Sequence, residues 1–188
     1  EGYSIYPLYT VSHSMTTKEC QDYCEKTKTC KYAKTAPLTK KGLCSVSLGT
    51  NQMMWGSPSA NTWSNNKYIK KTGASNSTYS TSSGSKNIKE LRNINMIPKL
   101  VRLEGNVGDQ GWGNKTRGLY IRGYKGSATI FNKSLVAPRT KGYKFTSGEW
   151  DVNPNNLRID KIKCFIYSKG YGHSIRAKNV KFTVVGSK

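Results

Sequence analysis

The sequence predicts a mostly β protein, in which a small disulfide-stapled α+β module and an antiparallel β-sandwich are joined by a linker. Three observations predict this class. Four of the five cysteines lie between Cys20 and Cys44, residues 73–86 are dominated by small polar side chains, and short strand-like segments follow. Clustered thiols staple small modules, whereas a segment poor in apolar residues cannot order itself. We therefore expect a module over residues 1–72, a Ser/Gly-rich linker over 73–86 and a sandwich binding domain over 87–188.

The first predicted element is a short helix that begins after Thr16. Thr16 and Glu19 have the spacing of a capping box, in which each side chain accepts a hydrogen bond from the other residue's amide. About three turns follow, through Lys26. Cys20 and Cys24 are four residues apart, so both lie on the helical face that packs against the rest of the module.

Two strands are expected after this helix, over residues 30–33 and 43–48. The four cysteines of the module allow three disulfide pairings. A zinc site is the competing interpretation, but structural zinc usually takes two close cysteine pairs, and the spacings here are three, five and thirteen residues. Disulfides require an oxidising compartment, so an extracellular or virion location is expected.

Three segments of the module form a recognisable pattern: Thr17-Lys18-Glu19-Cys20-Gln21-Asp22-Tyr23-Cys24, Thr29-Cys30-Lys31-Tyr32 and Gly42-Leu43-Cys44-Ser45-Val46. With the Cys-x3-Cys-x5-Cys-x13-Cys spacing around one helix, they make residues 3–71 resemble the PAN/apple module family. In that family the first helix cysteine bridges to the later strand and the second to the nearer one. The resemblance therefore implies the pairs Cys20–Cys44 and Cys24–Cys30, and a binding module for proteins or carbohydrates. It is a reduced version, because the bridge that ties the termini of many apple modules has no cysteines here.

The second domain alternates apolar and polar residues. Strands are expected over residues 100–104, 118–124, 127–131, 143–145, 159–167 and 175–185, separated by Gly, Asn, Pro and Ser clusters. In the fifth of these, Ile162, Cys164 and Ile166 share one face. Cys164 therefore falls in an inward apolar series and is expected to be a buried free thiol, with an interchain disulfide as the alternative.

The order of these strands, the loop over residues 108–114 and the closing segment over 176–184 resemble galactose-binding-like jelly-roll sandwiches. The resemblance covers residues 98–186 and implies a jelly-roll-like fold with a carbohydrate- or surface-binding role. Such sandwiches serve many functions, so the resemblance supports the predicted fold more strongly than the predicted function.

Two sets of residues are candidates for ligand contact. The candidates are Asp109, Gln110, Trp112 and Asn114 in the Gly-rich loop, and Tyr120, Arg122, Tyr124, Lys163 and Tyr167 on outward strand faces. An indole offers a flat apolar surface to a sugar ring or a side chain, and alternating basic and aromatic residues suit an acidic protein or glycan. The structural alternatives are that Trp112 plugs the end of the sandwich and that the strand faces are merely solvated.

The sequence shows no catalytic, metal or cofactor site. Its two histidines and ten carboxylates carry no pairing signal, and no serine lies in a Gly-x-Ser-x-Gly elbow. Asp151, Asn153 and Asn155 have the spacing of a calcium loop, but Ile162 stands where the loop needs Glu. An ordinary turn is expected there, with a shallow calcium site as the alternative. No apolar run approaches the length of about 20 residues that a helix needs to cross a bilayer.

The formal net charge of +21 favours anionic partners. The charge is uneven, with +6 over residues 1–72 and +14 over 89–188. Solubility is the alternative explanation. An oxidised protein without a recognition motif seldom meets nucleic acid, so an acidic protein surface or a glycan is expected instead.

We expect a non-catalytic interaction or structural protein that docks on a larger assembly, such as the capsid proteins of a large DNA virus. The alternative is a secreted lectin or adhesin that uses Trp112. Because the chain begins at Glu1 rather than Met, a processed or trimmed precursor is also expected.

Overall fold

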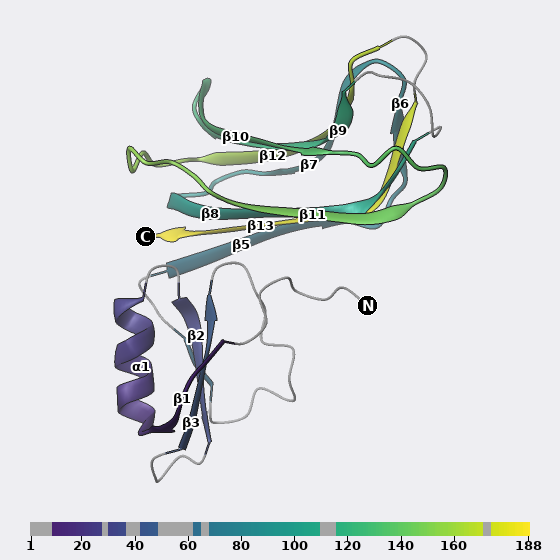
Figure 1. Ribbon diagram of the computed structural model, residues 1–188. Coiled ribbons are helices and arrows are strands. Elements are labelled where there is room, and N and C mark those ends of the chain that lie inside the picture. The colour runs from purple at the N-terminus through teal and green to yellow at the C-terminus, as the bar shows by residue number, and fades with distance from the viewer. Residues whose placement is uncertain are drawn as a thin grey trace. The chain divides into compact units, whose positions relative to one another are not determined.

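A computed structural model of the chain describes residues 9–27, 30–36, 42–48, 62–64, 68–109, 116–170 and 174–188. Within them the chain is mostly β, and its helix α1 comes early in the sequence, as its purple colour shows (Figure 1). The chain divides into two compact units. The first comprises Glu1–Lys70 with Val185–Lys188, and the second comprises Lys71–Val184.

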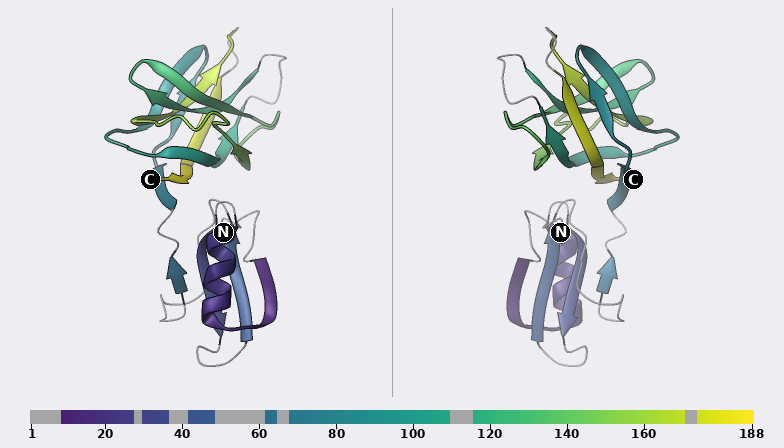
Figure 2. Two further views of the ribbon diagram at one scale, coloured as in Figure 1. Left: turned by 90° about the vertical axis from the view of Figure 1, so that its left-hand side faces the viewer. Right: turned by 90° about the vertical axis from the view of Figure 1, so that its right-hand side faces the viewer.

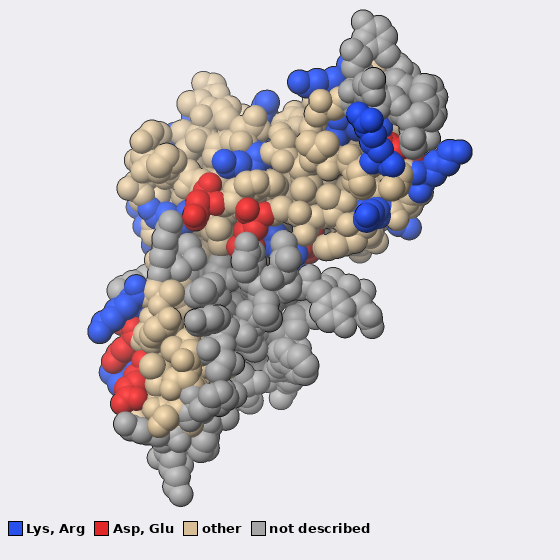
Figure 3. Space-filling view, viewed as in Figure 1, with Lys and Arg blue, Asp and Glu red and all other residues tan. Residues whose placement is uncertain are grey.

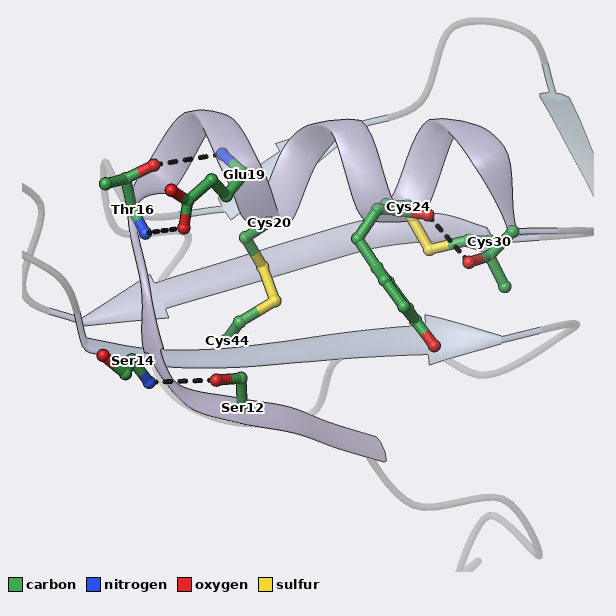
Figure 4. The surroundings of a disulfide bond; sticks show 10 residues. Ser12, Ser14, Thr16, Glu19, Cys20, Cys24, Cys30 and Cys44 are labelled. Carbon is green, nitrogen blue, oxygen red and sulfur yellow. Dashed lines mark hydrogen bonds between the residues drawn. A yellow bond between two sulfur atoms is a disulfide. The ribbon is translucent and has the colours of Figure 1, made fainter.

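The first unit is an antiparallel sheet that carries one helix. Its strands are β1 (Tyr9–Met15), β2 (Cys30–Ala36), β3 (Gly42–Leu48) and β4 (Thr62–Ser64), in the order β1-β3-β2-β4. The helix α1 (Thr17–Lys26) lies along this sheet (Figure 2). It begins and ends where the sequence predicts, because the capping box is formed. The Thr16 hydroxyl accepts from the Glu19 amide at 3.1 Å, and the Glu19 carboxylate accepts from the Thr16 amide at 3.1 Å (Figure 4).

Two disulfides fasten α1 to the sheet. Cys20 bonds to Cys44 of β3, and Cys24 bonds to Cys30 of β2 (Figure 4). This is the pairing that the family resemblance implied, and it excludes these thiols as zinc ligands. All four cysteines are fully buried and form one cluster with Ala33 and Val46. So small a core needs covalent support, which the disulfides supply.

The second unit is a sandwich of two sheets built from antiparallel pairs. One sheet has the order β10-β9-β12-β7, and the other has the order β11-β8-β13-β5 with β6 paired to β13 (Figure 1). Their bounds are β5 (Tyr68–Ser75), β6 (Tyr79–Thr81), β7 (Gly84–Leu91), β8 (Ile97–Gly108), β9 (Arg117–Lys125), β10 (Ala128–Val136), β11 (Lys144–Asp151), β12 (Lys161–Ser168) and β13 (Ile175–Ser187). The six strands expected in this region are therefore confirmed as β8 to β13.

Side-chain alternation in β12 follows the predicted pattern. Ile162, Cys164 and Ile166 have no exposed surface, whereas Lys163 and Phe165 are only half-buried. Period-two alternation thus separates an inward apolar face from an outward face. The interior between the two sheets is the larger core of the protein.

The predicted flexible linker over residues 73–86 is wrong. These residues form the end of β5, all of β6 and the start of β7. Gly73 packs so closely on the Phe182 ring that a Cβ at this position would clash with it. Thr81 is 5% exposed and pairs with Ile175 of β13. The small side chains therefore serve close packing within the sandwich.

The segment that has calcium-loop spacing is an ordinary turn, as the sequence favoured. The Asn153 amide closes it, donating to the Leu157 carbonyl at 2.6 Å and accepting from the Leu157 amide at 2.9 Å. Asn153 has φ of +58° and Asn156 has φ of +56°, a region that asparagine tolerates better than most residues. Both Asn153 amide atoms are thus used in the turn.

Candidate binding groove

The outward face of the β10-β9-β12-β7 sheet brings most of the predicted contact residues together. Antiparallel register aligns outward side chains in rows that cross the sheet. From β10 to β7, three adjacent rows are Asn132, Arg122, Lys163 and Glu90; Ser134, Tyr120, Phe165 and Asn87; and Val136, Gly118, Tyr167 and Ser85. The β9 residues between them, Leu119 and Ile121, are fully buried on the opposite face.

Tyr120 is the centre of an aromatic cluster on this face. Its ring stacks on Phe165 with centroids 4.6 Å apart, and the Tyr167 ring lies 5.5 Å away. The guanidinium carbon of Arg122 lies 4.7 Å from the Tyr120 ring centroid. Tyr120 and Tyr167 are each only 9% exposed. Their rings are therefore held in place by neighbours, which leaves little ring surface on which a base or sugar could stack.

A groove of about 860 Å³ opens beside this cluster. Tyr120, Arg122 and Tyr167 line it together with short polar side chains. These short side chains include Ser83, Ser85, Thr116, Asn132 and Ser134, and the charged side chain of Lys169 also lines the groove. No Asp or Glu is among its described lining residues, so the charged groups of this lining are all positive.

Arg122 is one of the two positively charged residues in the described lining of this groove, with Lys169. Its Nε donates to Asn132 Oδ1 at 3.3 Å, and it forms no ion pair within the part of the chain that the structure describes. A guanidinium has five N–H donors, so most of them remain available to a ligand. Arg122 is therefore fixed by Asn132 and Tyr120 while its charge stays uncompensated.

Two other cations of this face, Lys163 and Lys161, are already engaged. Lys163 Nζ lies 3.3 Å from a Glu90 carboxylate oxygen, and Lys161 Nζ lies 5.2 Å from the Tyr124 ring centroid. These residues share the outward face with Arg122 but do not line the groove. The predicted contacts Lys163 and Tyr124 thus lie beside the groove and not in it.

The tyrosine hydroxyls are the second polar feature of the groove. In the described part of the chain, neither the Tyr120 nor the Tyr167 hydroxyl has a hydrogen-bond partner. Burial raises the pKa of Tyr167 above its usual value, so this phenol keeps its proton at neutral pH. It can therefore donate as well as accept.

Of the four candidate residues in the Gly-rich loop, Asp109 lies within the described residues. Asp109 is 1% exposed, and its Oδ2 accepts from Arg117 Nε at 2.6 Å, while Arg117 itself is 2% exposed. A carboxylate buried in an ion pair is not free to contact a partner, so we assign Asp109 a supporting role instead of ligand contact. Gln110, Trp112 and Asn114 lie outside the described residues.

Sequence reasoning missed several residues of this groove. Asn132 and Ser134 follow the end of the strand expected over 127–131, and Ser85 falls in the supposed linker. The hairpin turn at Gly126, which has φ of +58°, was the available signal, because it sets β10 against β9. It places Ser134 opposite Tyr120.

Among the described residues, no group of three or more His, Cys, Asp or Glu side chains could hold a metal ion. In the same residues, no helix is long and apolar enough to cross a membrane.

No protein-family model matches the sequence, and no curated protein matches it either. Solved structures do match. T=1 particles derived from infectious bursal virus share 14% identity with a TM-score of 0.50, over 78% of this chain and 38% of that chain. The VP2 subviral particle of infectious bursal disease virus shares 12% identity with a TM-score of 0.49, over 78% and 40%. The chain thus spans about two fifths of these proteins.

At such low identity the first of these matches shows the fold alone. The chain is a jelly-roll-like sandwich of a kind also found in a virus-derived particle. The likeness says nothing of ligands or partners, since this architecture serves many roles.

Proposed function

We propose that the chain is a non-catalytic, strongly basic interaction protein that docks on an acidic protein or glycan surface of a larger assembly, such as the capsid of a large DNA virus. The observation that carries the proposal is the uncompensated charge of the sandwich. Residues 71–184 contain 21 Lys and Arg against six Asp and Glu, a net charge of +15.

The few carboxylates of the sandwich are already used internally. Glu90, Glu104, Asp109 and Glu149 are in ion pairs. Asp160 accepts a hydrogen bond from the Gly126 amide at 2.7 Å. The surplus cations therefore meet solvent or a partner. In Figure 3 the sandwich's Lys and Arg side chains gather toward the end at which Figure 1 shows β6. A field of one sign attracts anionic surfaces and repels cationic ones.

The non-catalytic part of the proposal is supported by the chemistry of the groove. Its described lining contains no carboxylate and no imidazole. Carboxylates and imidazoles are the groups that most often serve as general bases in enzymes. The virion part is supported by the two disulfides, which need an oxidising setting, and by the fold shared with a virus-derived particle.

The test is to purify assemblies that contain the native chain on a density gradient and wash them with NaCl from about 0.1 to 1 M. We expect a constant ratio of chain to particle across the gradient and release at high salt, since docking is electrostatic. Full chain carrying Arg122→Gln and Lys161→Gln should rebind more weakly than chain carrying Lys18→Gln and Lys26→Gln on α1. A chain that stays at the top of the gradient, or rebinds equally in both variants, contradicts the proposal.

A further inference from the structure

We propose that the groove on the β10-β9-β12-β7 sheet binds a sugar unit that carries a carboxylate, with Arg122 as the anion contact. The inference rests on the proposed function and names the chemistry of the partner. It places sugar recognition on the sheet face, away from the loop of Trp112.

Arg122 has both the charge and the fixed orientation of an anion contact. Its guanidinium lies over the Tyr120 ring and is held by Asn132, so its orientation is set before a ligand arrives. Within the described residues it forms no ion pair. A pre-oriented guanidinium suits two parallel N–H···O bonds to one carboxylate.

Hydroxyl and amide groups line the groove together with Arg122. Tyr120, Tyr167, Ser85, Ser134 and Asn132 all line the groove. Each of their side chains can both donate and accept, as sugar hydroxyls do. The ligand would therefore be recognised by hydrogen bonds around one charged contact.

The position of Tyr120, Arg122 and Tyr167 within the sheet favours a sugar over a peptide as the ligand. β9 and β12 are interior strands of the sheet, paired on both sides. A peptide that joins a sheet does so at an unpaired edge, where backbone groups are free. Tyr120, Arg122 and Tyr167 stand on the face of these two strands, whose backbones are already paired.

The small number of cations in the described lining of the groove limits the charge of the ligand. Arg122 and Lys169 are the Lys and Arg residues that line the groove, in a volume of about 860 Å³. Small-molecule sites have volumes of roughly 300–1,000 Å³. The groove thus matches a short glycan terminus with one carboxylate better than a polysulfated chain, which needs a long row of cations.

The experiment titrates the full oxidised chain with 3′-sialyllactose and with a glucuronic acid-containing disaccharide, using lactose and cellobiose as neutral counterparts. We expect at least one acidic probe to bind tenfold or more tightly than its counterpart. Arg122→Gln should remove that difference. Tyr120→Phe and Tyr167→Phe, which keep the ring packing, should each weaken binding roughly threefold to tenfold.

The matched control is Arg176→Gln. Arg176 is exposed on β13 of the other sheet, and its guanidinium carbon lies 5.8 Å from the Tyr143 ring centroid, so the substitution removes a similar stacked cation. It should leave the affinity unchanged. Equal binding of acidic and neutral probes, equal losses in Arg122→Gln and Arg176→Gln, or equal competition by a Glu-rich peptide would overturn the inference. If the sugar result is negative but the chain still binds the particle, only the sugar assignment fails. If particle binding is also lost, the proposed function fails too.

Discussion

Cys164 lies on the inward side of β12, where its side chain has no exposed surface. Burial raises the pKa of its thiol to about 12, against a smaller opposing effect of the Phe165 backbone amide. The thiolate is the reactive form of cysteine, so this thiol is inert in the folded chain. Its burial contradicts the alternative of an interchain disulfide in the folded protein.

The raised pKa of Cys164 predicts a loss of stability at alkaline pH. The folded thiol keeps its proton, whereas the unfolded thiol ionises near its ordinary pKa of 9.0. The unfolded state therefore binds fewer protons, and stability falls between pH 9 and about 12, by up to about 1.4 kcal/mol per pH unit. Urea unfolding of Cys164→Ala at pH 8 to 10.5 should show a shallower decline than the parent. Identical slopes would contradict this account.

Gly123 in β9 makes room for the Phe131 ring, which is 5% exposed in the core. A Cβ on Gly123 would clash with this ring. Gly123→Ala should therefore lower the unfolding free energy by about 1–3 kcal/mol, the usual cost of overpacking. Ser127→Ala, at an exposed position of the adjoining turn, is the control and should change it by less than about 0.5 kcal/mol. Similar effects of the two substitutions would contradict this prediction, because they would show that the Phe131 ring makes room for the added Cβ at little cost.

Alternation along the chain predicts which way a strand residue points but not how much of it is covered. Cys164 was placed inward correctly for this reason. Tyr120 was placed outward, yet it is 9% exposed, because Phe165 and Arg122 pack on its ring. That contact depends on the register of β9 against β12, which the sequence alone does not specify.

The two disulfides of the α1 unit should differ in their contribution to stability. Cys20–Cys44 closes a separation of 24 residues, and Cys24–Cys30 closes one of six. Chain-entropy reasoning assigns them about 3.4 and about 2.2 kcal/mol. We expect the Cys20→Ala, Cys44→Ala pair to lower the denaturation midpoint of this unit more than the Cys24→Ala, Cys30→Ala pair. Fluorescence or proteolysis of the full chain measures this, and the reverse order would refute it.

The helix and its cap were predictable because their signals are local. Thr16 and Glu19 specify the start of α1 without reference to the rest of the fold. Residues 73–86 were mistaken for a linker because their order comes from distant partners. The Gly73 contact with Phe182 and the β6–β13 pairing join segments about one hundred residues apart in sequence. The amino-acid composition of residues 73–86 predicts neither contact.

The chain as a whole combines a large positive charge with a compact sandwich. Like charges repel within a folded domain, and salt screens this repulsion over about 10 Å at 0.1 M. The melting temperature of the full oxidised chain should therefore rise as NaCl increases from about 0.02 to 0.3 M. Calorimetry or fluorescence checks this. A melting temperature that falls with salt would mean that internal ion pairs outweigh the repulsion.

The fold class of the molecule could be predicted from cysteine spacing and strand alternation, and the net charge suggested the anionic partners that we propose. The groove could not be predicted in full. It combines Ser85 of β7, Tyr120 of β9, Ser134 of β10 and Tyr167 of β12, which only the sheet order brings together. A sequence can show that these residues face outward, but not that they meet.

Lysine footprinting of the full chain, free and docked on its native assembly, tests the proposed docking face most directly. Lys161 lies on that face, Lys169 lines the groove, and Lys18 on α1 has a side chain that is 77% exposed. Docking through the sheet face predicts several-fold protection of Lys161 and Lys169 from acetylation, with Lys18 unchanged. Protection of Lys18 alone, or equal reactivity of all three lysines in both states, would contradict docking through this face.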